Sequence, residues 1–144
     1  MTEPNPQNPC FGCGGGNPRG MQLVFERDEE QQRIRGRFRL GPEYQGGPGF
    51  LHGGIIATVL DEALGKMNRF HGATAVTAEL SIEYLRPIRV DEEIVVEAFH
   101  LERNGRQLWH AGEIRNAAGQ VLARGKGRFV VIDPEKYVRE SPAP

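Results

Sequence analysis

The sequence predicts an α+β domain in which an antiparallel β-sheet wraps around one long central helix. Three observations predict this arrangement. Residues 55–69 form the only long stretch without proline that favours helix, and their apolar side chains surround most of the helix circumference. Strand-like stretches precede and follow this helix. Asn104-Gly105 separates two of the later stretches, and this residue pair suits a tight type I′ hairpin turn.

The strands are expected from their patterns of apolar and polar residues. Residues 21–27 and 32–40 should form a hairpin, because the charged residues 28–30 lie between them. In the second of these strands Ile34 and Phe38 alternate with arginines, which predicts one buried and one basic face. Four strands are expected after the helix, over residues 75–86, 93–103, 106–115 and 120–132.

Length and composition limit the organisation and the partners of the chain. The 144 residues suit one domain and leave no room for two. We expect an irregular N-terminal arm over residues 1–20, one domain over residues 21–138 and a tail over residues 139–144. The net charge of -1 gives no reason to expect nucleic acid binding. The sequence shows neither an N-terminal signal peptide nor a membrane span, so a cytoplasmic protein without membrane contact is expected.

His52-Gly53-Gly54 lies at the start of the predicted helix. Backbone N–H groups there have no helical partner, and the helix dipole is positive. Two glycines let a ligand come close to the backbone. Such a terminus can bind a carboxylate or phosphate, or stabilise the oxyanion that forms when a carbonyl is attacked. A tight turn into the helix explains the two glycines equally well.

Asp61 interrupts an otherwise apolar helix, and burial of an unpaired carboxylate is costly. Residues three and four positions apart share a helix face. Asp61 therefore lies on a stripe of small residues, namely Gly54, Ala57, Thr58 and Gly65. This pattern predicts a carboxylate that a ligand can approach, and the structural alternative is an Asp61 that only hydrogen-bonds a backbone. Glu62 is expected to pair with Lys66 at the surface.

The spacing of these two features predicts a site shared between subunits. Asp61 follows Gly54 by seven residues, which is about 10 Å along a helix. One chain cannot easily bring both groups to one carbonyl. If both act on one substrate, the helix start of one subunit must meet Asp61 of another, so at least a homodimer is expected.

Several stretches together resemble hotdog-fold thioesterases of the phenylacetate-pathway type. They are QGGPGFLHGG at residues 45–54, LDEA at 60–63, CFGCG at 10–14, NPRGM at 17–21 and SIEYLRP at 81–87. The likeness covers most of the chain. In that family the catalytic acid lies nine positions after the motif histidine, as Asp61 does after His52. Hotdog relatives often pair dimers, so the resemblance also implies a dimer of dimers as an alternative.

The resemblance implies roles for individual residues. Gly53 is implied to supply an oxyanion-hole N–H, His52 to shape that corner, and Asp61 to act as general base or nucleophile. Thr77 matches a hydroxyl that some relatives use to hold the attacking water. Other relatives use an amide six positions before the histidine; that position is Gly46 here, and Gln45 is the nearest amide.

Basic residues are candidates for the phosphates of coenzyme A, which is part of the implied substrate. Arg86 ends the strand that carries Thr77, and together with Gly54 it is a candidate substrate-binding residue. Two rows also repeat with the two-residue period of a strand: Arg33, Arg35, Arg37 and Arg39, and Arg124, Lys126 and Arg128. A solvated sheet face is the favoured interpretation of these rows.

Neither a metal nor a separate cofactor is expected. Cys10 and Cys13 have the spacing of zinc ligands, but no second pair follows in the sequence. Pooling of four thiolates by two subunits is the less favoured alternative. His71, His100 and His110 are isolated in the sequence, which is typical of surface or satisfied core histidines.

Three functions compete. The first is an acyl-CoA thioesterase, which hydrolyses acyl-CoA to the free acid and CoA. The second is a non-catalytic acyl-CoA sensor of the same fold, which normally carries an added DNA-binding segment. The third is a hotdog hydratase or dehydratase, which normally carries a His-Phe-Pro-Gly-type motif in place of His52-Gly53-Gly54. The thioesterase is favoured.

Overall fold

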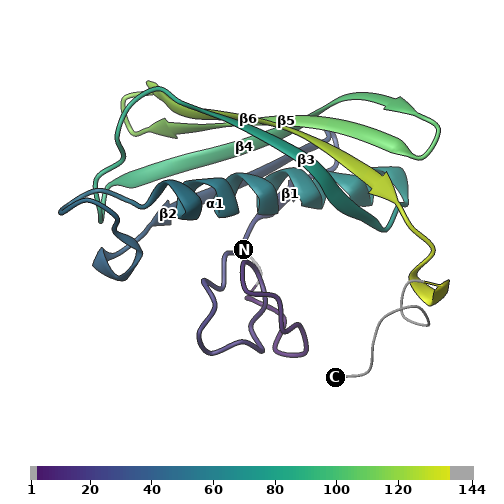
Figure 1. Ribbon diagram of the computed structural model, residues 1–144, viewed down its shortest axis with the longest axis horizontal. Coiled ribbons are helices and arrows are strands. Elements are labelled where there is room, and N and C mark those ends of the chain that lie inside the picture. The colour runs from purple at the N-terminus through teal and green to yellow at the C-terminus, as the bar shows by residue number, and fades with distance from the viewer. Residues whose placement is uncertain (1–2, 137–144) are drawn as a thin grey trace.

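The computed structural model describes residues 3–136, in which six antiparallel strands form one curved sheet around a helix (Figure 1). The strands are β1 Glu26–Asp28, β2 Arg33–Arg39, β3 Ala75–Tyr84, β4 Glu93–Asn104, β5 Gln107–Asn116 and β6 Val121–Val131. The helices are α1 Gly53–Lys66 and the short 3-10 helices η1 Pro42–Tyr44 and η2 Met67–His71. Strand order in the sheet is β1-β2-β4-β5-β6-β3. The predicted α+β hotdog arrangement is confirmed.

Helix α1 lies along one face of the sheet because its apolar residues meet a surface made partly of glycine. Leu60 and Leu64 are fully buried. A Cβ added to Gly112 would come 2.8 Å from a Leu64 methyl, and one added to Gly125 would come 3.4 Å from a Leu60 methyl. These glycines let the helix approach the sheet closely. The predicted helix 55–69 begins two residues earlier and continues as η2.

The predicted first strand, 21–27, is mostly wrong in its backbone pairing. Met21, Leu23 and Phe25 are buried, but only Glu26–Asp28 pairs with β2. The Met21 and Leu23 N–H groups instead donate to arm carbonyls. Apolar residues at every second position fit one buried side of this segment, but they do not identify the partner of its backbone. That partner is the N-terminal arm rather than β2.

The predicted hairpin between β4 and β5 is confirmed, but its turn differs from the type I′ expectation. Asn104 pairs with Gln107, so Gly105 and Arg106 are the central residues. Of these two, Gly105 alone has a positive φ, +60°. That matches the pattern of a type II′ turn, which places glycine first.

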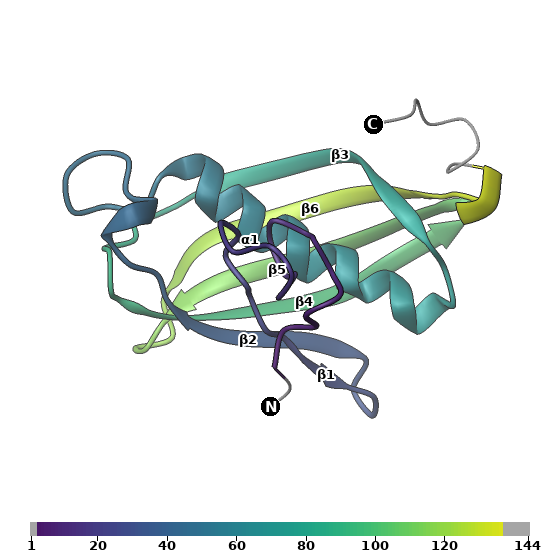
Figure 2. The same ribbon diagram turned by 90° about the horizontal axis from the view of Figure 1, so that it is seen from below.

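The N-terminal arm crosses α1 on the side away from the sheet (Figure 2). Gly12 packs so closely against Glu62 that a side chain there would collide with it. Cys10 Sγ donates to Glu62 Oε1 over 3.3 Å. The predicted Glu62–Lys66 ion pair is therefore wrong: Glu62 faces the arm, and Lys66 lies over the Phe25 ring.

The predicted tail 139–144 and the last two residues of the predicted domain lie outside the described residues. Among the described helices, none is both long and apolar enough to cross a membrane.

Candidate functional site

The start of α1 is capped by His52. Its backbone is extended, with φ -64° and ψ 137°, and its Nδ1 accepts a hydrogen bond from the Gly54 N–H over 2.9 Å. This is the position and the role of a helix N-cap. The Gly53 N–H has no hydrogen-bond partner within residues 3–136. Of the two glycines, Gly53 is therefore the one with a free donor at the positive end of the helix.

Gln45 closes the loop that leads to this helix. Its Oε1 accepts from the Gly49 N–H over 3.1 Å, and its backbone bridges to Leu51. Gln45, His52 and Gly54 all line one open pocket, together with Glu43, Tyr44, Ile55 and Thr58. The structure thus brings three predicted site residues together, although hydrogen bonds to the loop and to His52 already use the Gln45 carbonyl oxygen and the Gly54 N–H.

Asp61 is half-buried on α1, and Thr77 on β3 contacts it. The Thr77 Oγ1 donates to Asp61 Oδ1 over 2.8 Å. Burial raises the pKa of the Asp61 carboxyl above its usual value, with a smaller contribution from the Glu62 charge, while the Thr77 hydrogen bond lowers it. A carboxylate with a raised pKa is a stronger base, which suits proton abstraction near neutral pH.

A β-bulge explains why Thr77 can reach Asp61. Ile82 packs toward α1, so regular alternation would turn Thr77 away from the helix. The pairing of β3 with β6 shifts by one residue between Thr77 and Glu79. The bulge re-aims the Thr77 side chain toward the helix.

We expect Asp61→Asn to be at least as stable as the parent protein at pH 7. Because the pKa of Asp61 is raised in the folded state, that state favours the protonated carboxyl. The protonated Asp61 carboxyl therefore stabilises the fold below its pKa in the unfolded chain, near 3.8. This contribution is lost as the pH rises through the higher pKa of Asp61 in the folded state. Asparagine has no such ionisation. Thermal unfolding of both proteins from pH 3 to pH 7 should show the melting temperature of the parent falling relative to that of Asp61→Asn as the pH rises. A relative rise for the parent would contradict the raised pKa of Asp61.

Tyr84 holds β3 against the start of α1, a contact that the sequence did not predict. Its hydroxyl donates to the Gly53 carbonyl over 2.7 Å, although the residue is 53% exposed. The one feature of the sequence that could have pointed to Tyr84 is its place on the same predicted strand as Thr77. Gly53 and Asp61 are eight residues apart, hence about 12 Å along the helix axis. Within one chain the free N–H and the carboxylate therefore stay separate.

Arg86 lies two residues beyond Tyr84, at the same end of α1 as Gly53. It is exposed, and its side chain has no hydrogen bond or ion pair within the described part of the chain. The first basic row is committed to acidic neighbours: Arg33 to Glu97, Arg35 to Asp28 and Glu97, and Arg37 and Arg39 to Glu93. In the second row Arg124 lies 3.6 Å from Glu83. Arg86 is thus a free candidate for a phosphate, as is Lys126 of the second row, whose side chain also has no hydrogen bond or ion pair within the described residues.

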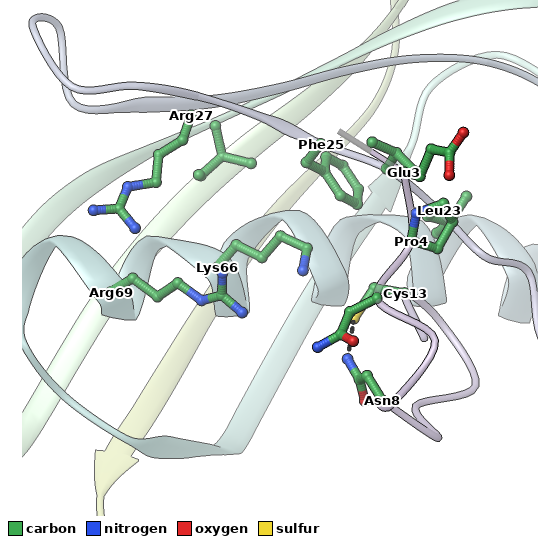
Figure 3. Close-up of a pocket in the computed structure, with 12 residues that line it drawn as sticks. Glu3, Pro4, Asn8, Cys13, Leu23, Phe25, Arg27, Lys66 and Arg69 are labelled. Atoms are coloured by element: carbon green, nitrogen blue, oxygen red, sulfur yellow. Dashed lines mark hydrogen bonds between the residues drawn. The ribbon is translucent and has the colours of Figure 1, made fainter. Parts of the chain in front are cut away.

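A second pocket lies between the arm, the segment before β1 and the later part of α1 (Figure 3). Arg27, Lys66 and Arg69 give it a basic wall, and Cys13 lies at its edge. Asp61 is not among its lining residues. Burial, aided by the Glu62 charge, raises the pKa of the Cys13 thiol to about 11. Cys13 is therefore protonated at neutral pH and is a poor nucleophile.

His110 is a buried, hydrogen-bonded core histidine, in line with the expectation, but His71, His100 and His110, which lie far apart in the sequence, come together in the fold. Their ring nitrogens converge beyond the end of α1, at the opposite end from His52. β-pairing brings His100 opposite His110.

Comparisons with known proteins found a matching family model, similar sequences and similar solved structures. The family described as "Thioesterase superfamily" matches residues 48–123, which include His52, Gly53, Asp61 and Thr77. Acyl-coenzyme A thioesterase THEM4 of Bos taurus is 33% identical over 118 residues, which cover 81% of this chain and 48% of that protein. The chain thus spans about half the length of such curated relatives.

Solved structures show the same fold. A crystal structure of a thioesterase superfamily protein has a TM-score of 0.78 and 35% identity, and the match covers 85% of this chain and 60% of that one. The BH2602 protein of Bacillus halodurans, solved with CoA, has a TM-score of 0.68 and 31% identity. Here the match covers 78% of this chain and 75% of that one. The resemblance noted from the sequence is confirmed at the level of the family.

Proposed function

The chain belongs to the thioesterase superfamily, and from this premise we propose that it hydrolyses acyl-CoA thioesters with Asp61 as the catalytic carboxylate. One observation carries the proposal: Asp61 is half-buried on α1, has a raised pKa and accepts a hydrogen bond from Thr77. A buried ionisable group of this kind is costly to keep and is typical of functional sites. The THEM4 relative, an acyl-CoA thioesterase, and the CoA-bound structure support the substrate class.

In the proposed reaction the thioester carbonyl lies against the Gly53 N–H, which stabilises the oxyanion of the tetrahedral intermediate. Asp61 either takes a proton from water as the water attacks, or attacks the carbonyl itself to give an anhydride that water then cleaves. In both routes the C–S bond breaks, the CoA thiolate leaves and takes up a proton, and the free acid is released. Thr77 orients the Asp61 carboxylate and the water beside it.

The direct test is turnover of a panel of acyl-CoA thioesters of different chain length and aromatic content, with detection of free thiol. Release of CoA from at least one thioester supports the proposal. Tight acyl-CoA binding without release would support the sensor function instead. If no thioester of the panel is hydrolysed or bound, both functions are rejected.

We further propose that two copies of the chain build each site. In the described sheet β3 is an edge strand, paired only with β6. Val76, Tyr84 and Leu85 on and beside this edge are 39%, 53% and 42% exposed. An exposed strand edge with apolar neighbours is suited to pair with a second strand. Pairing there would bring Asp61 of one copy toward Gly53 of the other.

Subunit mixing tests this shared site. Asp61→Asn and Gly53→Pro should each be nearly inactive, but a heterodimer of the two has one site with both native groups. After subunit exchange, mixed variants should recover up to about a quarter of parent activity, since half the dimers are mixed and each has one native site. No recovery, despite exchange demonstrated with a labelled subunit, would reject the shared site.

Arg86 is proposed to hold a phosphate of CoA. Arg86→Glu should raise KM several-fold and change kcat little, because a contact far from the thioester adds mainly uniform binding. Arg37→Glu is the matched charge reversal on the row that is already paired with acidic residues, and it should leave KM close to the parent value. Equal KM for Arg86→Glu and the parent would reject the assignment.

A further inference from the structure

Three histidines from separate elements meet at the end of α1. His71 ends η2, His100 lies on β4 and His110 lies on β5. One ring nitrogen from each lies within 4.8 Å of the other two. The two Nδ1 atoms of His100 and His110 are 3.1 Å apart.

The contact with Asn68 determines which ring nitrogen of His110 carries the proton. His110 is fully buried, and its Nε2 lies 2.8 Å from the Oδ1 of Asn68, which is also buried. An amide oxygen only accepts, so His110 Nε2 must carry the proton and Nδ1 keeps its lone pair. That lone pair is directed toward His100.

His71 has a donor or acceptor without a partner. Its Nε2 is buried and has no hydrogen-bond partner within the described residues. Buried polar atoms nearly always have one. A hydrogen-bonded core network accounts for Asn68, His110 and His100, but it leaves this nitrogen unexplained.

We propose that His71, His100 and His110 bind a divalent transition-metal ion, with Zn²⁺ as the best match and water as the fourth ligand. Zinc–nitrogen bonds of about 2.0–2.1 Å in tetrahedral geometry separate ligand nitrogens by about 3.3 Å, close to the 3.1 Å between the two Nδ1 atoms. On binding, the His100 proton moves from Nδ1 to Nε2, so the neutral ring supplies its lone pair. Asn68 plays the part of the outer-shell acceptor that orients a metal-bound histidine. This site departs from the expectation of no metal.

The surroundings suit this ligand set. Burial lowers the pKa of all three histidines, that of His110 to about 3, so the rings are neutral at pH 7, the form that binds metals. Of the charged neighbours, Arg103 lies near His71 and His100 and opposes a cation, while Glu102 beside His100 favours one.

The metal would join η2 to β4 and β5 and take no part in the proposed hydrolysis. Asn68 follows Asp61 by seven residues, about 10 Å along the helix direction. Chelation should therefore leave turnover unchanged, and metal binding itself is the quantity to measure.

The 144-residue chain should first be treated with a chelator, which is then removed, and it should afterwards bind one Zn²⁺ per chain in calorimetry. His71→Ala and His100→Ala, both at partly exposed positions, should bind at least about 10-fold more weakly. Cys10→Ser/Cys13→Ser is the matched control, because those thiols and Glu62 form the other cluster of ligand-type residues among the described ones. It should bind as the parent does.

Cobalt(II) gives a reading that needs no variant. The parent with one Co²⁺ should show visible bands of four-coordinate cobalt without the thiolate-to-cobalt charge-transfer band that cysteine ligands produce. No Zn²⁺ binding by the parent would overturn the proposal. So would a thiolate band, or binding that the cysteine variant loses and the histidine variants keep.

Discussion

Asp61→Asn is expected to lower kcat for acyl-CoA by at least about 100-fold, the loss typical of removed acid–base catalysis. Asparagine has nearly the same shape and still accepts from Thr77, but it can neither take a proton nor form an anhydride. KM should change much less, because the Gly53 N–H and Arg86 remain. Steady-state kinetics with the best thioester of the panel measures both constants.

Glu62→Gln is the matched control for this loss, since it removes the same charge one residue along the helix. Glu62 contacts Cys10 in the arm, so its change should loosen the arm and cost little turnover. An active Asp61→Asn together with an inactive Glu62→Gln would show that the wrong carboxylate has been assigned.

Gly53→Pro is expected to lower kcat by about 100- to 1000-fold, the cost of one lost oxyanion donor. Proline deletes the N–H but is favoured at the first position of a helix. His52 already has the extended backbone, φ -64° and ψ 137°, that a residue before proline requires. The helix should therefore form, which circular dichroism and thermal unfolding can verify alongside kcat.

Gly53→Ala distinguishes the loss of the N–H donor from the effect of an added side chain. A Cβ at this position would meet Tyr84 no closer than 3.6 Å, an ordinary contact, and the N–H is kept. Its kcat should fall far less than that of Gly53→Pro. Equal losses in the two variants would mean that steric contact, and not the missing donor, disables the site.

The sequence by itself determined the long helix, most of the strands and the place of Asp61 and His52-Gly53-Gly54 on the helix. These features are local, because a 3.6-residue or two-residue period and a helix start are legible within about a dozen residues. The position of the β4–β5 turn could be predicted from Gly105. The type of turn could not, because it depends on which residues pair across it. The predicted strand 21–27 is buried at Met21, Leu23 and Phe25, but its sequence did not reveal that the N-terminal arm is the partner of its backbone.

Only the tertiary structure decided which distant residues meet. Ile82 and Thr77 lie on opposite sides of a regular strand, and the bulge before Glu79 turns Thr77 toward Asp61. Likewise, the turn register alone would place His100 opposite Ala111, and the irregularity between His100 and Glu102 brings it opposite His110. A one-residue irregularity reverses the facing of every residue beyond it, and it follows from packing across the whole sheet, which local sequence does not encode.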